Sequence, residues 1–254
     1  MKGYLLIFSF VLFSVFSIAQ QVEDKARIKS LLDNKTPALW VFTGNSITQG
    51  AKHTHGLRSF PEIFEERLRW ELGRANDFVI NTAISGHTTS NILSGFEPRV
   101  SRFKPDVVVL MIGTNDASDK NKIDVDSFEN NLALIINNIR NINAIPVLLT
   151  PNPIITEKVP ERARLEYYVA KILTVSRKFN VILVDNWLVW NTELQEKYNG
   201  AVFKELLNDP LHPNGQGHKE IAIAIFKELS IFDAGSATCS GDYYEGDHFI
   251  ENNN

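Results

Sequence analysis

Short apolar runs alternate with amphipathic stretches along most of this chain. Each of the runs is almost wholly apolar and predicts a buried strand. They lie at residues 38–43, 78–81, 107–112, 146–149 and 181–184. The run at 107–112 is apolar at every position, which is typical of a parallel strand that is covered on both faces. The pattern therefore predicts five strands of a buried sheet.

Apolar residues at helical spacing fill the intervals between these runs. In the first interval they recur every four residues, at Phe60, Phe64, Leu68 and Leu72. Gly73 ends this pattern, so a helix is predicted from about residue 59 to 72. The same spacing predicts helices at about 125–139, 163–178 and 214–229. Alternating strands and helices predict an α/β domain of three layers, α/β/α, with a flavodoxin-like, five-stranded parallel sheet.

The two ends of the chain differ from this central region. Lys2 precedes an uncharged apolar run from Tyr4 to Ile18, and small residues follow, which is typical of a signal peptide. The alternative is a membrane anchor, but the run is shorter than the roughly 20 residues that span a bilayer. We therefore expect a signal peptide at 1–20, one domain at 21–232, and a polar, loosely held tail at 233–254.

Composition narrows the possible partners. The 26 basic and 30 acidic residues give a formal charge of −4, and no basic run predicts a nucleic-acid surface. Cys239 is the only cysteine, so the chain has no internal disulfide. We expect an exported protein, periplasmic or secreted, without stable membrane insertion and monomeric.

Polar side chains gather where three predicted strands end and just before the last predicted helix. These stretches are 44–48, 84–87, 113–116 and 209–213. In parallel α/β sheets, ligands bind beyond the carboxyl ends of the strands, where the strand order reverses. In the order 2-1-3-4-5 the first three stretches would share one edge of the sheet. We therefore expect Ser46, Gly86 and Asn115 to converge there.

These residue types fit acyl transfer by a serine nucleophile. The hydroxyl of Ser46 needs a base, and His212 suits that role near neutral pH. Asp209 precedes His212 by three residues, so its carboxylate can reach one ring nitrogen while the other faces the serine. The amides of Ser46 and Gly86 and the side chain of Asn115 could stabilise the oxyanion.

The same four stretches, in this order, resemble the signature blocks of the SGNH hydrolases, also called the GDSL-like lipase/acylhydrolase family. The most specific are Gly-Thr-Asn-Asp at 113–116 and Asp-x-x-His at 209–212. The resemblance implies an SGNH hydrolase fold, a catalytic triad of Ser46, Asp209 and His212, and an oxyanion hole made by Ser46, Gly86 and Asn115. It implies no cofactor and no metal.

One position departs from the family's name. Asn45 stands where the name implies an Asp before the serine, and the stretch Gly-Asn-Ser-Ile-Thr-Gln-Gly at 44–50 looks more like the carbohydrate-esterase branch. This resemblance favours an esterase that removes short acyl groups, most simply O-acetyl, from a small-molecule or polysaccharide substrate. A lipolytic acylhydrolase or thioesterase is the first alternative. A sugar-binding module without activity is the second.

Three further residues have less specific interpretations. We expect Asp116 to brace its loop rather than to react. His53 and His55 lie one residue apart and could bind a metal, but no third ligand is evident from the sequence, so contact with substrate is the favoured role. The stretch 44–50 superficially resembles a phosphate loop but lacks its Gly-Lys pair.

Overall fold

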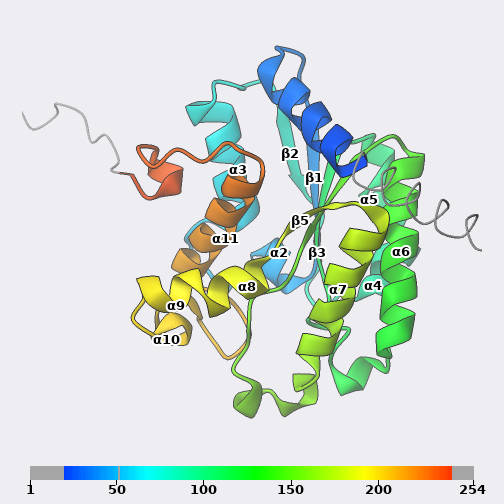
Figure 1. Ribbon diagram of the computed structural model, residues 1–254, viewed down its shortest axis with the longest axis vertical. Coiled ribbons are helices and arrows are strands. Elements are labelled where there is room, and N and C mark those ends of the chain that lie inside the picture. The colour runs from blue at the N-terminus through cyan, green and yellow to red at the C-terminus, as the bar shows by residue number, and fades with distance from the viewer. Residues whose placement is uncertain (1–19, 51, 242–254) are drawn as a thin grey trace, which may run out of the picture.

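The computed structural model describes residues 20–50 and 52–241. The predicted signal peptide falls almost wholly outside these residues. The described chain forms one five-stranded sheet in which every pair of neighbours is parallel, in the order β2-β1-β3-β4-β5 (Figure 1). The strands are β1 (Leu39–Gly44), β2 (Phe78–Asn81), β3 (Val107–Met111), β4 (Ile145–Leu149) and β5 (Ile182–Val184). The predicted flavodoxin-like fold is therefore confirmed.

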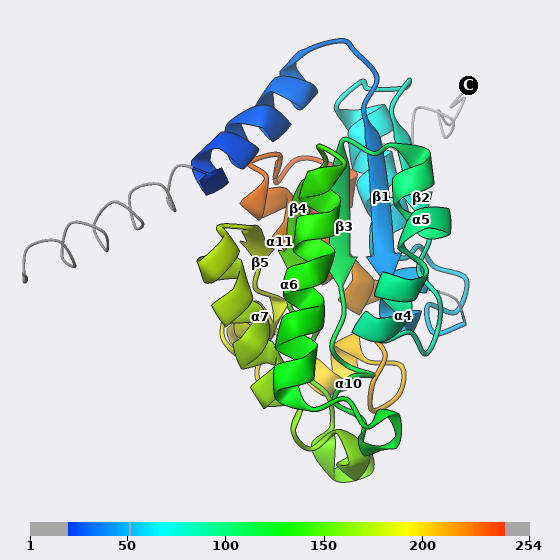
Figure 2. The same cartoon turned by 90° about the vertical axis from the view of Figure 1, so that its right-hand side faces the viewer.

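Helices cover both faces of the sheet. One face carries α3 (Phe60–Glu66) and α11 (Gly215–Glu228), and the other carries α4 (Thr89–Ser94), α6 (Val125–Asn141) and α7 (Leu165–Phe179) (Figures 1 and 2). The shorter helices are α2 (Ser46–Gln49), α5 (Phe96–Arg99), α8 (Asn186–Asn191), α9 (Glu193–Lys197) and α10 (Val202–Leu206).

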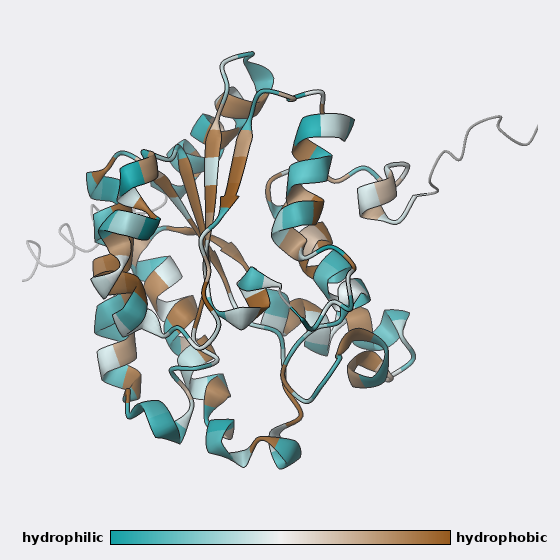
Figure 3. Cartoon of the chain, turned by 180° about the vertical axis from the view of Figure 1, so that it is seen from behind, coloured by the Kyte–Doolittle hydropathy of each residue, from teal (hydrophilic) through white to brown (hydrophobic). Residues whose placement is uncertain are grey.

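Alternate residues of the central strands supply the two cores. On β3, Val107 and Val109 belong to the core beneath α3 and α11, whereas Val108 and Leu110 belong to the core beneath α6 and α7. Side chains of a strand point alternately to opposite faces, so a strand covered on both sides must be apolar throughout. Figure 3 shows the apolar residues gathered on the strands and on the helix faces turned toward them.

A helix at residues 20–33, which the sequence pattern did not predict, lies at the end of the sheet opposite the carboxyl ends of its strands (Figure 1). Its buried Asp24 lies 3.3 Å from Arg140 of α6, and Lys25 lies 2.8 Å from Glu228 of α11. The helix thus connects the two helical layers. Among the described residues no helix is both long and apolar enough to cross a bilayer.

Two segments differ from the sequence expectation. The predicted helix at 59–72 divides into α3 and a π-helical turn at Arg67–Glu71, where the hydrogen bonds shift register. The tail was expected to be loosely held, but residues 237–239 form a 3-10 turn, and Cys239 is buried in the core. Within the described part of the tail, Thr238 and Cys239 are therefore packed, whereas residues 233–235 are exposed.

Candidate active site

Ser46 is presented by a tight turn at the end of β1. Asn45 precedes α2, and its side-chain oxygen accepts a hydrogen bond of 3.0 Å from the Ile47 amide. This is the local role expected of Asn45 at a helix N-cap. Gly44 allows the close approach of β3, because a Cβ atom there would lie 2.3 Å from the carbonyl oxygen of Met111. The turn therefore depends on a glycine before the Asn-Ser pair.

Asp209 and His212 face each other across a single turn just before α11. The carboxylate oxygen Oδ1 of Asp209 accepts hydrogen bonds of 2.8 Å from the amides of both Leu211 and His212. The His212 Nδ1 atom lies 2.9 Å from Asp209 Oδ2 and 3.0 Å from Oδ1. One carboxylate thus closes the turn and orients the imidazole.

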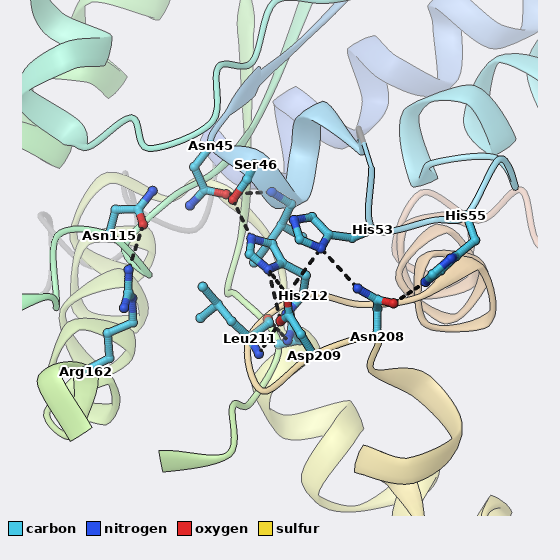
Figure 4. A network of polar contacts seen from close by, with 12 residues as sticks. Asn45, Ser46, His53, His55, Asn115, Arg162, Asn208, Asp209, Leu211 and His212 are labelled. Atoms are coloured by element: carbon cyan, nitrogen blue, oxygen red, sulfur yellow. Dashed lines mark hydrogen bonds and ion pairs between the residues drawn. The ribbon is translucent and has the colours of Figure 1, made fainter. Parts of the chain in front are cut away.

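The turn brings the other ring nitrogen of His212 to Ser46. The distance between His212 Nε2 and Ser46 Oγ is 2.9 Å, although 166 positions separate the two residues (Figure 4). Ser46, His212 and Asp209 therefore form a continuous chain of hydrogen bonds, in the arrangement that lets a base activate a hydroxyl.

The electrostatics of the chain favour an ionised carboxylate. Partial burial raises the pKa of Asp209, but the hydrogen bonds from the Leu211 and His212 amides and from the imidazole outweigh burial and hold that pKa below its usual value. An ionised Asp209 stabilises the positive charge that His212 gains when it takes a proton.

The predicted oxyanion donors also lie beside Ser46. The loop that carries Gly86 is attached to the serine turn, because Ile84 N donates to Gly44 O at 3.2 Å and Ser85 N donates to Gln49 Oε1 at 2.8 Å. Within the described part of the chain, the amides of Ser46 and Gly86 have no hydrogen-bond acceptor. They are therefore free to donate to a ligand.

Asn115 follows β3 and is held from both sides. Its Nδ2 donates to the carbonyl oxygen of His87 at 3.1 Å. Its Oδ1 accepts from Arg162 at 3.5 Å (Figure 4). These contacts fix which end of the carboxamide carries the donors. One N–H of Asn115 then remains available. Arg162 also pairs with the neighbouring Glu161.

Asp116 braces the loop instead of facing the reacting groups. Its Oδ1 accepts from the amide of Thr89 at 2.8 Å and from the hydroxyl of Thr89 at 2.6 Å, at the start of α4. The carboxyl is fully buried, and burial raises its pKa. The expected bracing role agrees with this geometry.

His53 lies directly against His212. The two rings are parallel to within 4°, and their centroids are 3.6 Å apart. His53 Nδ1 lies 3.2 Å from Asp209 Oδ2 and 3.2 Å from Asn208 Nδ2 (Figure 4). His55, by contrast, contacts Asn208 Oδ1 with its own Nε2. The two histidines are thus separated by Asn208.

His53, Asp209 and His212 place potential metal-ligand atoms within 4.8 Å of one another. Imidazole nitrogens bind metals along lone pairs that lie in the ring plane, and these two ring planes are parallel and separated. One ion cannot lie in both planes at a normal bond length of about 2.0–2.1 Å. The stacked geometry suits shared hydrogen bonding to Asp209 better than metal binding.

Comparison with known proteins identifies the family at this point. Residues 42–220 match the GDSL-like lipase/acylhydrolase family. The chain belongs to this family. The match spans the serine turn, the Gly86 and Asn115 loops and the Asp209–His212 turn, and family membership makes the protein a carboxylic ester hydrolase.

Individual proteins resemble the chain to different extents. It is 26% identical over 206 residues to an acetylxylan esterase of Geobacillus stearothermophilus, covering 74% of this chain and 92% of that one. The crystal structure of that esterase superposes with a TM-score of 0.65 at 22% identity, over 76% of this chain and 94% of that chain. An uncharacterized protein of Mycoplasma pneumoniae is 36% identical over 122 residues, which are 47% of this chain and 14% of the relative.

Two residues of this GDSL-like hydrolase were missed or underestimated by sequence reasoning. Arg162 was not considered, because it lies outside the four polar stretches and reaches Asn115 only through the folded loop after β4. His53 was assigned to a substrate-contacting loop, whereas the structure places its ring on His212. The Asp-x-x-His spacing locates the base but does not show which ring covers it.

Proposed function

We propose that this protein is a serine esterase that hydrolyses short-chain acyl esters, chiefly O-acetyl groups, on a carbohydrate. The unbroken chain from Ser46 through His212 to Asp209 carries the mechanism. The likeness to an acetylxylan esterase over most of both chains supports the substrate class. The Asn45-Ser46 pair, which resembles the carbohydrate-esterase branch, supports it too.

The first half of the reaction forms an acyl-enzyme. Ser46 Oγ attacks the carbonyl carbon of the ester while His212 Nε2 takes the hydroxyl proton. The amides of Ser46 and Gly86 and the free N–H of Asn115 stabilise the oxyanion. The bond between the carbonyl carbon and the sugar oxygen then breaks, and the sugar oxygen takes the proton from His212.

The second half returns the enzyme to its starting state. A water molecule attacks the acyl carbon and gives a proton to His212. The bond to Ser46 Oγ breaks, Oγ recovers the proton from His212, and the carboxylic acid leaves. Asp209 stays ionised throughout and stabilises the imidazolium formed in each half.

The deciding experiment replaces the nucleophile. Ser46→Ala should abolish release of acetate from acetylated xylan and of nitrophenol from p-nitrophenyl acetate, with an unchanged melting temperature. Ser85→Ala, which removes an exposed hydroxyl from the adjoining loop, is the matched control and should keep wild-type activity. Full activity of Ser46→Ala would overturn the serine mechanism.

A second experiment tests the acyl group and the alternatives. A series of nitrophenyl esters should give the highest kcat/KM for acetyl and a steady decline with chain length. An optimum at eight carbons or more would instead identify a lipolytic acylhydrolase or thioesterase. Binding of oligosaccharides by a folded protein that a fluorophosphonate does not label at Ser46 would indicate a binding module.

We also propose that the protein is exported. The uncharged run from Tyr4 to Ile18 after Lys2, followed by small residues, supports this. Expression of the full chain in a bacterial host should yield a mature protein that lacks about the first 20 residues. Recovery of the intact N-terminus from the cytoplasmic fraction would contradict export.

A further inference from the structure

Two imidazoles share one carboxylate at this site. The same oxygen of Asp209, Oδ2, lies 2.9 Å from His212 Nδ1 and 3.2 Å from His53 Nδ1. The rings are stacked with centroids 3.6 Å apart, so His53 covers one face of His212. Both side chains are largely shielded, with 16% of His53 and 14% of His212 exposed.

The backbone around His53 is held in an uncommon conformation. Lys52 has a φ of 70° and His55 a φ of 53°, both in the left-handed region that non-glycine residues seldom adopt. Such strain persists only where the surroundings fix the conformation, and it is concentrated at functional sites. The loop therefore delivers the His53 ring to a defined place.

His53 Nδ1 lies near two partners, one of which requires a lone pair on this nitrogen and the other a proton. It lies 3.2 Å from Asn208 Nδ2, which can only donate, and 3.2 Å from the carboxylate oxygen of Asp209, which can only accept. His55 Nε2 engages the other end of the Asn208 amide and so keeps its NH₂ group toward His53. A His53 ring with its only proton on Nε2 accepts from Asn208 at Nδ1, whereas a ring with a proton on Nδ1 donates to Asp209.

The surroundings favour the neutral ring. Burial and the proximity of His212 lower the pKa of His53, and they outweigh Asp209, which raises it. Lys52 and His55 lower it further. His218 of α11, a further titratable neighbour, is itself kept neutral by burial, with a pKa of about 3.

We propose that His53 is a positioning residue for the catalytic base His212. The neutral ring of His53 holds the imidazole of His212 against Asp209 and stabilises the positive charge that His212 gains. This proposal rests on the serine mechanism above. A neutral aromatic face attracts a cation placed over it. A second cation at the same distance would repel it, so a protonated His53 opposes proton transfer from Ser46.

The kinetic test distinguishes the contribution of the aromatic ring face of His53 to kcat from the contribution of its titratable nitrogen. His53→Ala removes both, and we expect kcat for p-nitrophenyl acetate to fall about tenfold with little change in KM. His53→Phe restores a flat aromatic face, and we expect it to recover most of that loss at pH 8. Trp70→Ala is the control, because it removes an exposed aromatic ring from the π-helical turn, outside the His53 loop and the Asp209–His212 turn.

A second readout does not depend on turnover. In wild type, NMR titration of labelled histidines should place the midpoint of His53 below that of a free imidazole, because burial and the neighbouring His212 lower its pKa. A His53 ring that is protonated at pH 7 would contradict the neutral ring on which the proposal rests.

Several results would overturn the proposal. Wild-type kcat in His53→Ala from pH 6 to 9 would do so, as would a folded His53→Phe no more active than His53→Ala, or a His53 ring that is protonated at pH 7 in wild type. If Ser46→Ala stays active, the serine mechanism fails instead, and the NMR titration still decides whether the His53 ring is neutral.

Discussion

At the scale of single residues, the proposed oxyanion hole depends on the orientation of one carboxamide. Asn115 can stabilise negative charge only with an N–H turned toward Ser46. Two contacts set this orientation, because Nδ2 donates to His87 O at 3.1 Å and Oδ1 accepts from Arg162 at 3.5 Å. In the proposed mechanism, the arginine therefore supports the oxyanion hole through Asn115.

Replacement of this arginine should therefore reduce turnover selectively. Arg162→Met keeps an unbranched apolar stem but removes the contact with Asn115 Oδ1, so that His87 O alone orients the carboxamide, and we expect kcat to fall about tenfold. This loss is smaller than the 10²–10³ typical of removing an oxyanion donor outright. Steady-state kinetics with p-nitrophenyl acetate measure it.

Arg164→Met supplies the comparison for this variant. Arg164 is exposed and lies 4.0 Å from Asp119, away from Asn115. It should keep wild-type kcat. Equal losses in both variants would show that removal of a positive charge, and not the carboxamide orientation, lowers activity.

At the scale of elements, the ends of β1 and β3 approach so closely that only glycine fits at position 44. A Cβ atom there would lie 2.3 Å from Met111 O and 2.5 Å from Thr48 Oγ1. Gly44→Ala should lower the free energy of unfolding by about 2 kcal/mol or more, because the backbone of β3 cannot yield. Urea denaturation of the purified variant measures this change.

Gly73→Ala is the matched control for this substitution. Gly73 has a φ of 67°, but no atom that would contact an added Cβ lies within 4 Å. Its cost should be limited to the backbone strain of about 1–2 kcal/mol. A smaller loss in Gly44→Ala than in Gly73→Ala would contradict the clash.

A buried histidine joins α3 to α11. His218 Nδ1 accepts a hydrogen bond of 3.2 Å from the amide of Phe60, the first residue of α3. Burial lowers the pKa of His218 from 6.5 to about 3. The unfolded chain therefore binds a proton at pH 5 that the folded chain does not.

The stability of the fold should consequently fall in acid. Between the unfolded pKa of 6.5 and the folded value of about 3, His218 removes about 1.4 kcal/mol of stability for each unit by which the pH falls. Urea unfolding at pH 7.5 and pH 5 measures this. His218→Asn, which can accept from Phe60 but does not titrate, should show a smaller difference, and an equal difference would assign the acid sensitivity to other groups.

The elements that were predicted from the sequence are those that burial makes apolar. β3 was recognised because both of its faces are covered. The helix at 20–33 was missed because it lies on the surface, where Val22 is 61% exposed and Asp24 is among its few buried residues. Its apolar pattern is short, because Ile28, Leu31 and Leu32 pack on the core while Asp24 and Lys25 form ion pairs with α6 and α11.

The residues of the candidate site likewise divide into those that the sequence predicted and those that it did not. Ser46 and the Asp209–His212 pair lie in short segments whose spacing carries the chemistry. Arg162 and His53 act from loops that fold over these segments from elsewhere in the chain. Their contributions depend on ring stacking and on loop paths that include left-handed residues, and neither leaves a pattern in one sequence.

At the scale of the whole molecule, the C-terminal segment completes the layer formed by α3 and α11. Arg67 Nε donates to Ile231 O at 2.9 Å, and Thr238 N donates to Glu71 Oε1 at 3.0 Å. Cys239 is 4% exposed. These contacts connect the segment to the π-helical turn after α3.

Removal of this segment should destabilise the enzyme as a whole. A chain ending at residue 232 exposes the core around Cys239 and leaves Glu71 without Thr238, and we expect a loss of about 2 kcal/mol. The comparison is a chain ending at residue 241, which keeps every contact described here. Calorimetry of both should give a lower melting temperature for the shorter chain, and equal values would show that the segment is dispensable.

The turn from Asp209 to His212 has a consequence for how the geometry of the site is set. Its carboxylate closes the turn through two amides and orients the imidazole of the same turn, so base and acid partner are aligned within four consecutive residues. The geometry of this pair is therefore set by local backbone. Ser46 lies 166 positions away, so its distance from His212 depends instead on the packing of the sheet that carries the serine turn.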